Sequence, residues 1–282
     1  MELWYAIVDL LPFEWAEPGS MYFMKNALLA VLVISPLFGI LSTMVVHSRM
    51  SFFSDALGHS AFTGMAIGAI CGFREPTWAA VVFAILFAVL FNLVRRRSHL
   101  ASDTVIGVFS STAVALGIFI ATFGGGSFTQ YNSLLIGDIL SVEPAKIALL
   151  AVILLVVVLL WLCSFNQLML SSIHPALADS RGVGVFWQEA VFSAAIAVVV
   201  TVSMTWVGLL VINSLLVLPA AAARNVARNM RQYHLFSLLG AVISGLAGLM
   251  TSYYIGSSAG ASITLYLAVW FAVTFLLRKK CI

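Results

Sequence analysis

The chain has 282 residues, of which 62% are hydrophobic and only 9% charged, and its mean hydropathy is +1.08. Because a water-soluble domain carries about 25% charged residues, this composition excludes an ordinary soluble globule, a disordered chain and a nucleic-acid-binding module. A membrane-spanning helix needs about 20 apolar residues, so the length leaves room for about eight to ten spans.

The first 20 residues contain four acidic residues and several aromatic ones but no basic residue, and they close with Pro18 and Gly19. A cleavable signal peptide begins with a positively charged region, which this segment lacks. We therefore expect residues 1–20 to form an interfacial segment that lies on the membrane before the first span.

Nine apolar runs near spanning length follow, separated by short polar links. Continuous runs such as 151–160 (AVILLVVVLL) lack the alternation of barrel strands, so they predict helices. The sequence thus predicts an all-α integral membrane protein with about nine transmembrane helices. The number becomes eight or ten if a helix is miscounted, and 126–145 is the stretch that could hold a short extra or re-entrant helix. The links are too short for a soluble domain, so residues 1–282 form a single transmembrane domain. The runs are 24–46, 52–72, 77–94, 103–122, 146–163, 186–205, 207–223, 235–254 and 261–277.

The basic residues predict the orientation of these helices. With the N-terminus outside and nine spans, 11 of the 14 lysines and arginines fall on the cytoplasmic side, where such residues are enriched in membrane proteins. Only Lys25, Arg74 and Lys146 fall outside. We therefore expect the C-terminus in the cytoplasm. The inner residues are Arg49, Arg95, Arg96, Arg97, Arg181, Arg224, Arg228, Arg231, Arg278, Lys279 and Lys280.

The second run contains two ionisable residues, Asp55 and His59, one helical turn apart on one face. Ionisable groups inside a span cost about 2.5–3.5 kcal/mol at its centre, so each is a functional candidate. A carboxylate and an imidazole suit Zn²⁺, Mn²⁺ or Fe²⁺, and two ligands suit a transient site better than a structural one, which takes about four. The spacing fits equally well a buried hydrogen-bonded pair that joins two helices.

The same run has small residues at every fourth position: Ser60, Gly64, Gly68 and Gly72. Such spacing lets another helix approach closely, so these residues are interpreted as helix-packing positions without chemistry of their own.

The stretch 206–231 combines an apolar span, Pro219, four alanines and then Arg224, Arg228 and Arg231. The arginine spacing places all three on one face of a short helix. They fit an anchor against anionic headgroups or a cytoplasmic docking helix at 219–231 for a soluble partner.

Missing motifs narrow the function. The sequence has no GxxxxGK[ST] phosphate-binding loop, no HExxH and no GxSxG, so we expect neither ATP hydrolysis nor intramembrane hydrolysis by this chain alone. The sequence therefore offers no set of catalytic residues that would support a membrane-embedded enzyme.

The stretch from Arg49 to His59 (RMSFFSDALGH) resembles the signature of permeases of bacterial metal-uptake ABC transporters, the zinc/manganese/iron family. The similarity covers nearly the whole chain from about residue 30. It is specific to this family because several matching stretches occur in the same order along the chain, and not because of any single motif. Gly58 departs from the pattern, where Ser or Ala is expected. Further matches follow at 103–107 (DTVIG), 135–140 (LIGDIL), 181–182 (RG), 207–211 (VGLLV), 218–224 (LPAAAAR) and 258–261 (SAGA).

The resemblance implies a type II importer-like permease of the bacterial plasma membrane that works as a homodimer. Its implied partners are two cytoplasmic ATPase subunits, which bind ATP, and an extracytoplasmic metal-binding protein. It implies that Asp55 and His59 contact the passing metal, that 219–231 (Pro219, Arg224, Arg228 and Arg231) couples to the ATPase, and that no cofactor is bound permanently. Asp138 after Gly137 looks more like zinc-type than manganese-type members.

These implications suggest a mechanism. Two protomers about a twofold axis would offer about four ligands from two Asp–His pairs, the number that Zn²⁺ prefers. The alternative function is a stand-alone secondary metal-ion transporter or channel. Such a protein is expected to repeat its midplane ionisable residues in both halves, whereas this sequence has the Asp–His pair once.

Overall fold

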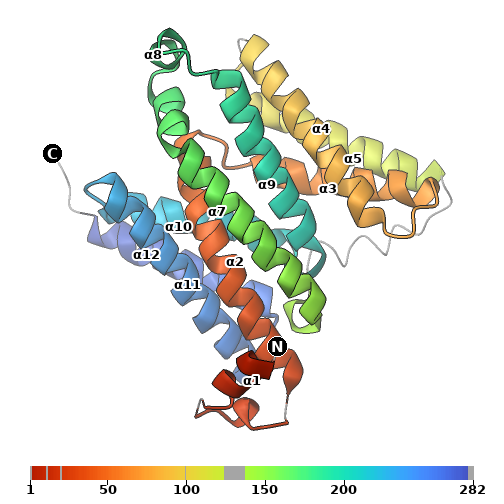
Figure 1. Ribbon diagram of the computed structural model, residues 1–282, viewed down its shortest axis with the longest axis vertical. Helices are drawn as coiled ribbons and strands as arrows, with labels where there is room; N and C mark the ends of the chain where they lie inside the picture. The colour runs from red at the N-terminus through yellow and green to blue at the C-terminus, as the bar shows by residue number, and fades with distance from the viewer. Residues whose placement is uncertain (1, 11, 20, 99, 124–136, 279–282) are drawn as a thin grey trace. The chain divides into compact units, whose positions relative to one another are not determined.

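The computed structural model describes residues 2–10, 12–19, 21–98, 100–123 and 137–278, and every regular element within these ranges is helical (Figure 1). The α-helices are α1 (Glu2–Val8), α2 (Tyr22–His47), α3 (Phe53–Ile70), α4 (Pro76–Arg97), α5 (Ser102–Phe123), α7 (Pro144–Ile173), α8 (Pro175–Ser180), α9 (Val185–Val207), α10 (Leu209–Val226), α11 (Met230–Ile255) and α12 (Ala259–Leu277). Two 3₁₀ turns, η1 (Glu14–Ala16) and η2 (Ile139–Ser141), complete the set.

Among the residues that the structure describes, nine long helices coincide with the nine apolar runs, which confirms the predicted all-helical membrane fold. Within the described ranges, eight of them are long and apolar enough to cross a membrane. The ninth, α3, is 18 residues long and is more polar because Asp55, His59 and several serine, threonine and glycine residues lie in it. Of the uncertain stretch 126–145, residues 126–136 lie outside the described part, and the rest forms η2 and the start of α7. The membrane orientation stays a prediction.

The helices group into two compact units. The first contains Met1–Thr43, Ile136–Leu154 and Trp206–Ile282, and its helices α10, α11 and α12 pack against one another. The second contains Met44–Leu135 and Leu155–Thr205, and in it α3 packs against both α4 and α5.

Small residues set the helix spacing in the first unit. A Cβ added to Gly245 of α11 would lie 2.4 Å from the hydroxyl of Ser35 in α2, and one added to Gly248 would lie 2.5 Å from the Ile263 backbone in α12. Ser237 of α11 donates a 2.7 Å hydrogen bond to the carbonyl of Gly39. Because helices that pack this closely gain van der Waals contact along their backbones, these positions hold α2, α11 and α12 together.

The N-terminal segment is tied to the start of α2 by side-chain contacts. Lys25 is fully buried, and its ammonium group lies 2.5 Å from the Asp9 carboxylate and donates to the carbonyl of Glu17 at 2.9 Å. The Trp4 indole donates to the Lys25 carbonyl at 3.0 Å, and the Tyr5 hydroxyl donates to the Asn26 side chain at 2.9 Å. Residues 2–19 thus neutralise a lysine that would otherwise be an isolated charge in an apolar helix.

Candidate metal site and docking segment

The link between α2 and α3 is a tight helix C-terminus that fixes where α3 begins. The amide of Met50 donates to the Val45 carbonyl at 2.9 Å and that of Arg49 to the Val46 carbonyl at 3.3 Å, with Arg49 at φ +55°. This is the Schellman arrangement with arginine in the left-handed position that glycine usually occupies. The link places Asp55 in the first turn of α3, where the helix dipole favours an anion.

Asp55 and His59 face each other across one turn of α3. The His59 Nε2 atom lies 3.5 Å from Asp55 Oδ2, and the two side chains are 29% and 42% exposed. Two donors each about 2.0–2.1 Å from one tetrahedral ion would lie about 3.4 Å apart. The pair thus already has the spacing of two adjacent metal ligands, and it is open enough for an ion to reach.

The opposite face of α3 packs against α4. A Cβ on Gly64 would lie 2.6 Å from Ala80 Cα, and one on Gly68 would lie 2.8 Å from Ala79 Cβ. Ser60, also buried, donates its hydroxyl to the Leu57 carbonyl at 2.8 Å within the same helix.

The remaining position of the small-residue series, Gly72, lies beyond the end of α3. It adopts φ +73°, and no atom of another segment lies within 4 Å of a Cβ built there. The structure therefore brings two of the four small residues, Gly64 and Gly68, against α4.

In the part of the chain that the structure describes, no group of three or more His, Cys, Asp or Glu side chains is placed to hold a metal ion. Asp138, on which the preference for zinc rests, caps η2, since its carboxylate accepts the Leu140 amide at 3.1 Å. The candidate ligands from this residue set are thus Asp55 and His59. Two ligands suit an ion that is cargo and must leave again.

The segment 219–231 differs from the single short helix that the arginine spacing predicts. Helix α10 continues through Pro219 to Val226, the backbone is extended at Ala227, and α11 starts at Met230. The break has a local cause: Asn229 caps α11 by accepting the Gln232 amide at 2.9 Å, while the Gln232 side chain accepts the Arg228 amide at 3.0 Å. The chain thus turns between two long helices instead of forming one separate helix.

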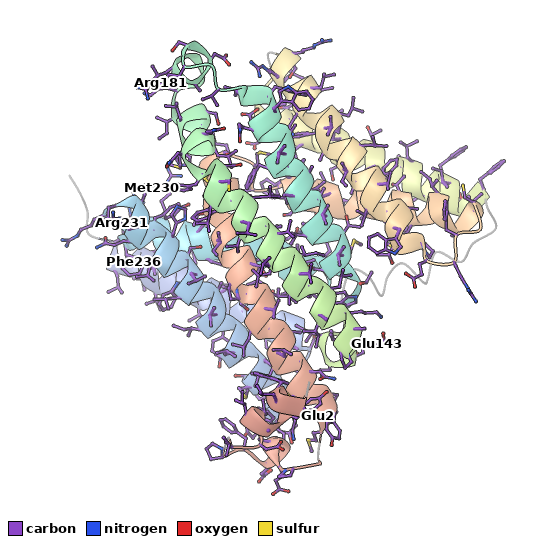
Figure 2. The ribbon with its side chains drawn as sticks, in the orientation of Figure 1. Glu2, Glu143, Arg181, Met230, Arg231 and Phe236 are labelled. Carbon is purple, nitrogen blue, oxygen red and sulfur yellow. The ribbon has the colours of Figure 1, made fainter. Side chains whose placement is uncertain are left out.

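The three arginines of this segment are nevertheless exposed together around the turn. Arg224 lies in the last turn of α10, Arg228 lies in the link and Arg231 is the second residue of α11. Figure 2 shows Arg231 beside Met230 in the first turn of α11. Asn225 donates to the Thr274 hydroxyl of α12 at 3.3 Å, which fixes the end of α10. The turn is therefore a supported, positively charged surface, and its docking role stays a prediction.

Two ion pairs at the end of α4, which the sequence did not predict, join it to α9 and α8. Arg95 lies 2.8 Å from the Glu189 carboxylate in α9, with side chains 13% and 27% exposed, and Arg96 lies 3.6 Å from Asp179 in α8. The sequence carries only a general signal for them, since three consecutive arginines and these two acids all fall at the predicted inner side but nothing in the sequence pairs them.

Comparison with known proteins matches this chain to one family of membrane transport proteins. Residues 20–278 match the model of the ABC 3 transport family. The chain is 31% identical to the manganese import system permease protein ScaB of Streptococcus gordonii, over 92% of each chain. It is 26% identical to the high-affinity zinc uptake system membrane protein ZnuB of Haemophilus influenzae, over 90% of this chain and 97% of that one.

A solved structure matches the fold over the full length. It is PsaBC from Streptococcus pneumoniae in complex with Fab, which matches with a TM-score of 0.79 and 27% identity over 99% of this chain and 97% of the other.

Proposed function

Because this chain belongs to the ABC 3 transport family, we propose that it is the membrane-spanning permease of an ATP-driven importer for divalent transition-metal ions. It is a multi-pass protein of the bacterial cell membrane. As a permease subunit it has no ATPase role of its own, and the ATP is bound and hydrolysed by cytoplasmic ATPase partners. An extracytoplasmic metal-binding protein delivers the ion.

The observation that carries the proposal is the Asp55–His59 pair. Its 3.5 Å separation fits two ligands of one ion, and its partial exposure leaves it accessible. Two ligands per protomer make a weak site, and a second copy about a twofold axis would bring the number to about four. A homodimer is therefore part of the proposal. Zinc is the first expected ion and manganese the second, and the permease relatives include one named for each.

The positively charged turn around 219–231 supports coupling. The turn is held by Asn225 and by the Asn229 cap, so a push from a docked ATPase would pass directly into α10 and α11. Movement of these helices during the ATPase cycle would open the ion path to the cytoplasm.

The test uses the bacterium that encodes the chain. Asp55→Asn removes the negative charge of the carboxylate and His59→Gln removes the imidazole nitrogen, both with similar side-chain size. We therefore expect accumulation of radiolabelled zinc and manganese to fall to the level of a deletion strain. His174→Gln changes an exposed histidine at the N-cap position of α8, whose side chain makes no capping hydrogen bond; it is the matched control and is expected to accumulate metal normally. Full uptake by both ligand variants would refute the site.

A stand-alone carrier or channel is distinguished by its energy source. The experiment compares ion uptake by vesicles that contain this chain alone, without ATP, with uptake by vesicles that contain the complete complex and ATP. If the chain alone accumulated the ions as fast as the complex, the importer mechanism would be wrong. The Asp–His pair would then serve a secondary transporter.

A further inference from the structure

The contact between α3 and α5 has a fixed register beside the Asp55–His59 pair. The Thr63 hydroxyl donates to the Ala113 carbonyl of α5 at 2.7 Å and also lies 3.2 Å from the His59 carbonyl. One turn further along α5, a Cβ on Gly117 would lie 2.4 Å from the Phe62 ring. The two helices therefore approach closely at this level and cannot slide past each other without losing a buried hydrogen bond.

The two helices run in the same direction, as their order of residues in Figure 1 shows. His59 precedes Thr63 by four residues and Ser110 precedes Ala113 by three, distances of about 6 Å and about 4.5 Å along the helix axes. Ser110 therefore lies at nearly the same level as His59.

Helical geometry also gives the face on which Ser110 lies. Viewed down the axis of α5, Ser110 is rotated by about 60° and Gly117 by about 40° from Ala113, both in the same sense. Both residues therefore belong to the stripe of α5 that meets α3. Ser111 points about 160° from Ala113 and about 100° from Ser110. It is exposed, whereas Ser110 is half-buried. The adjacent serines thus differ in whether they face α3.

We propose that the Ser110 hydroxyl is a third polar group of the Asp55–His59 ion site, beside the carboxylate and the imidazole, and helps to select the ion. This inference rests on the proposed function. A neutral oxygen is a harder donor than a further nitrogen or sulfur. The hydroxyl therefore narrows the preference for Zn²⁺ and lets the site also accept Mn²⁺. The hydroxyl acts by binding the ion directly or by accepting a hydrogen bond from water bound to it, and a loss of either contact weakens the site.

The experiment measures KM for zinc and for manganese in cells, with variants of the two adjacent serines. Ser110→Ala is expected to raise KM for manganese by about tenfold, the lower end of the range for losing an outer contact to a metal. Ser110→Cys supplies a soft thiolate and is expected to shift the ratio of zinc to manganese uptake toward zinc by at least as much. Ser110→Thr keeps the hydroxyl and should retain the wild-type ratio.

Ser111→Ala and Ser111→Cys are the matched controls and should leave both KM values unchanged. Membrane abundance by immunoblot separates misfolding from altered binding, and a gain in zinc preference cannot arise from misfolding. If Ser110→Cys and Ser111→Cys both show the wild-type zinc-to-manganese ratio while Asp55→Asn abolishes uptake, Ser110 is not part of the site and the proposed function stands. If the wild-type chain moves neither ion, the proposed function itself is wrong.

Discussion

The guanidinium of Arg95 at the end of α4 lies 2.8 Å from the carboxylate of Glu189 in α9, and it also lies 5.8 Å from the centre of the Phe91 ring. Helix α4 ends at Arg97 and helix α9 begins at Val185, so this pair is a long-range connection at one end of the second compact unit. Its partner pair, Arg96 with Asp179, adds α8 to the same cluster.

Arg95→Ala should therefore destabilise the second unit. Exposed ion pairs contribute about 0–1 kcal/mol and removal of one partner from a buried pair costs about 3–5 kcal/mol, so we expect about 1–2 kcal/mol for this partly buried pair. The measurement is the apparent Tm in detergent, followed by tryptophan fluorescence. Lys146→Ala, which breaks an exposed pair with Glu143, should leave the Tm unchanged. An equal Tm for both variants would contradict the role of the Arg95 pair.

Gly64→Ala should loosen the contact between α3 and α4. The added Cβ would lie 2.6 Å from the Ala80 backbone, so the helices must separate, at a cost of about 1–3 kcal/mol. Gly107 of α5 has open space around its missing Cβ, so Gly107→Ala is expected to raise helix stability by up to about 1 kcal/mol. Apparent Tm values that move in the same direction for both variants would rule out this packing role.

Gly137→Ala tests a close backbone approach in the first unit. A Cβ there would lie 2.2 Å from the amide nitrogen of Gly208, the residue between α9 and α10, and Gly137 itself has φ +66°. We expect little folded protein by size-exclusion chromatography. Gly19→Ala has the same kind of backbone, φ +79°, but open space, so it isolates the cost of the dihedral angle. Similar yields for both variants would show that the Gly208 contact is unimportant.

Reversing the charges of the turn tests its docking role. Arg224→Glu, Arg228→Glu and Arg231→Glu together should reduce the amount of ATPase subunit that copurifies with a tagged chain, because three exposed positive charges become negative. Arg74→Glu, an exposed change on the side predicted to face outward, should not affect copurification. An undiminished ATPase yield with the triple variant would assign the arginines to the membrane surface instead.

The sequence predicted the long helices because each depends on a local property, a continuous apolar run. It also placed Asp55 and His59 on one face, since helical spacing alone determines that. It could not predict the Arg95–Glu189 pair or the Thr63–Ala113 hydrogen bond, which depend on how distant helices pack. The structure has a turn where a single short helix was expected at 219–231. The cause is local, because Asn229 and Gln232 cap the start of a new helix.

The burial of Lys25 has a practical consequence for protein production. A shortened chain that lacks residues 2–19 would place an ammonium group in the first long helix without its counter-ion from Asp9, so membrane insertion should suffer. Replacing Lys25 by methionine in that shortened chain would remove the stranded charge while filling similar space. The leading residues thus serve as the built-in counter-charge of α2, and truncation and the residue at position 25 must be designed together.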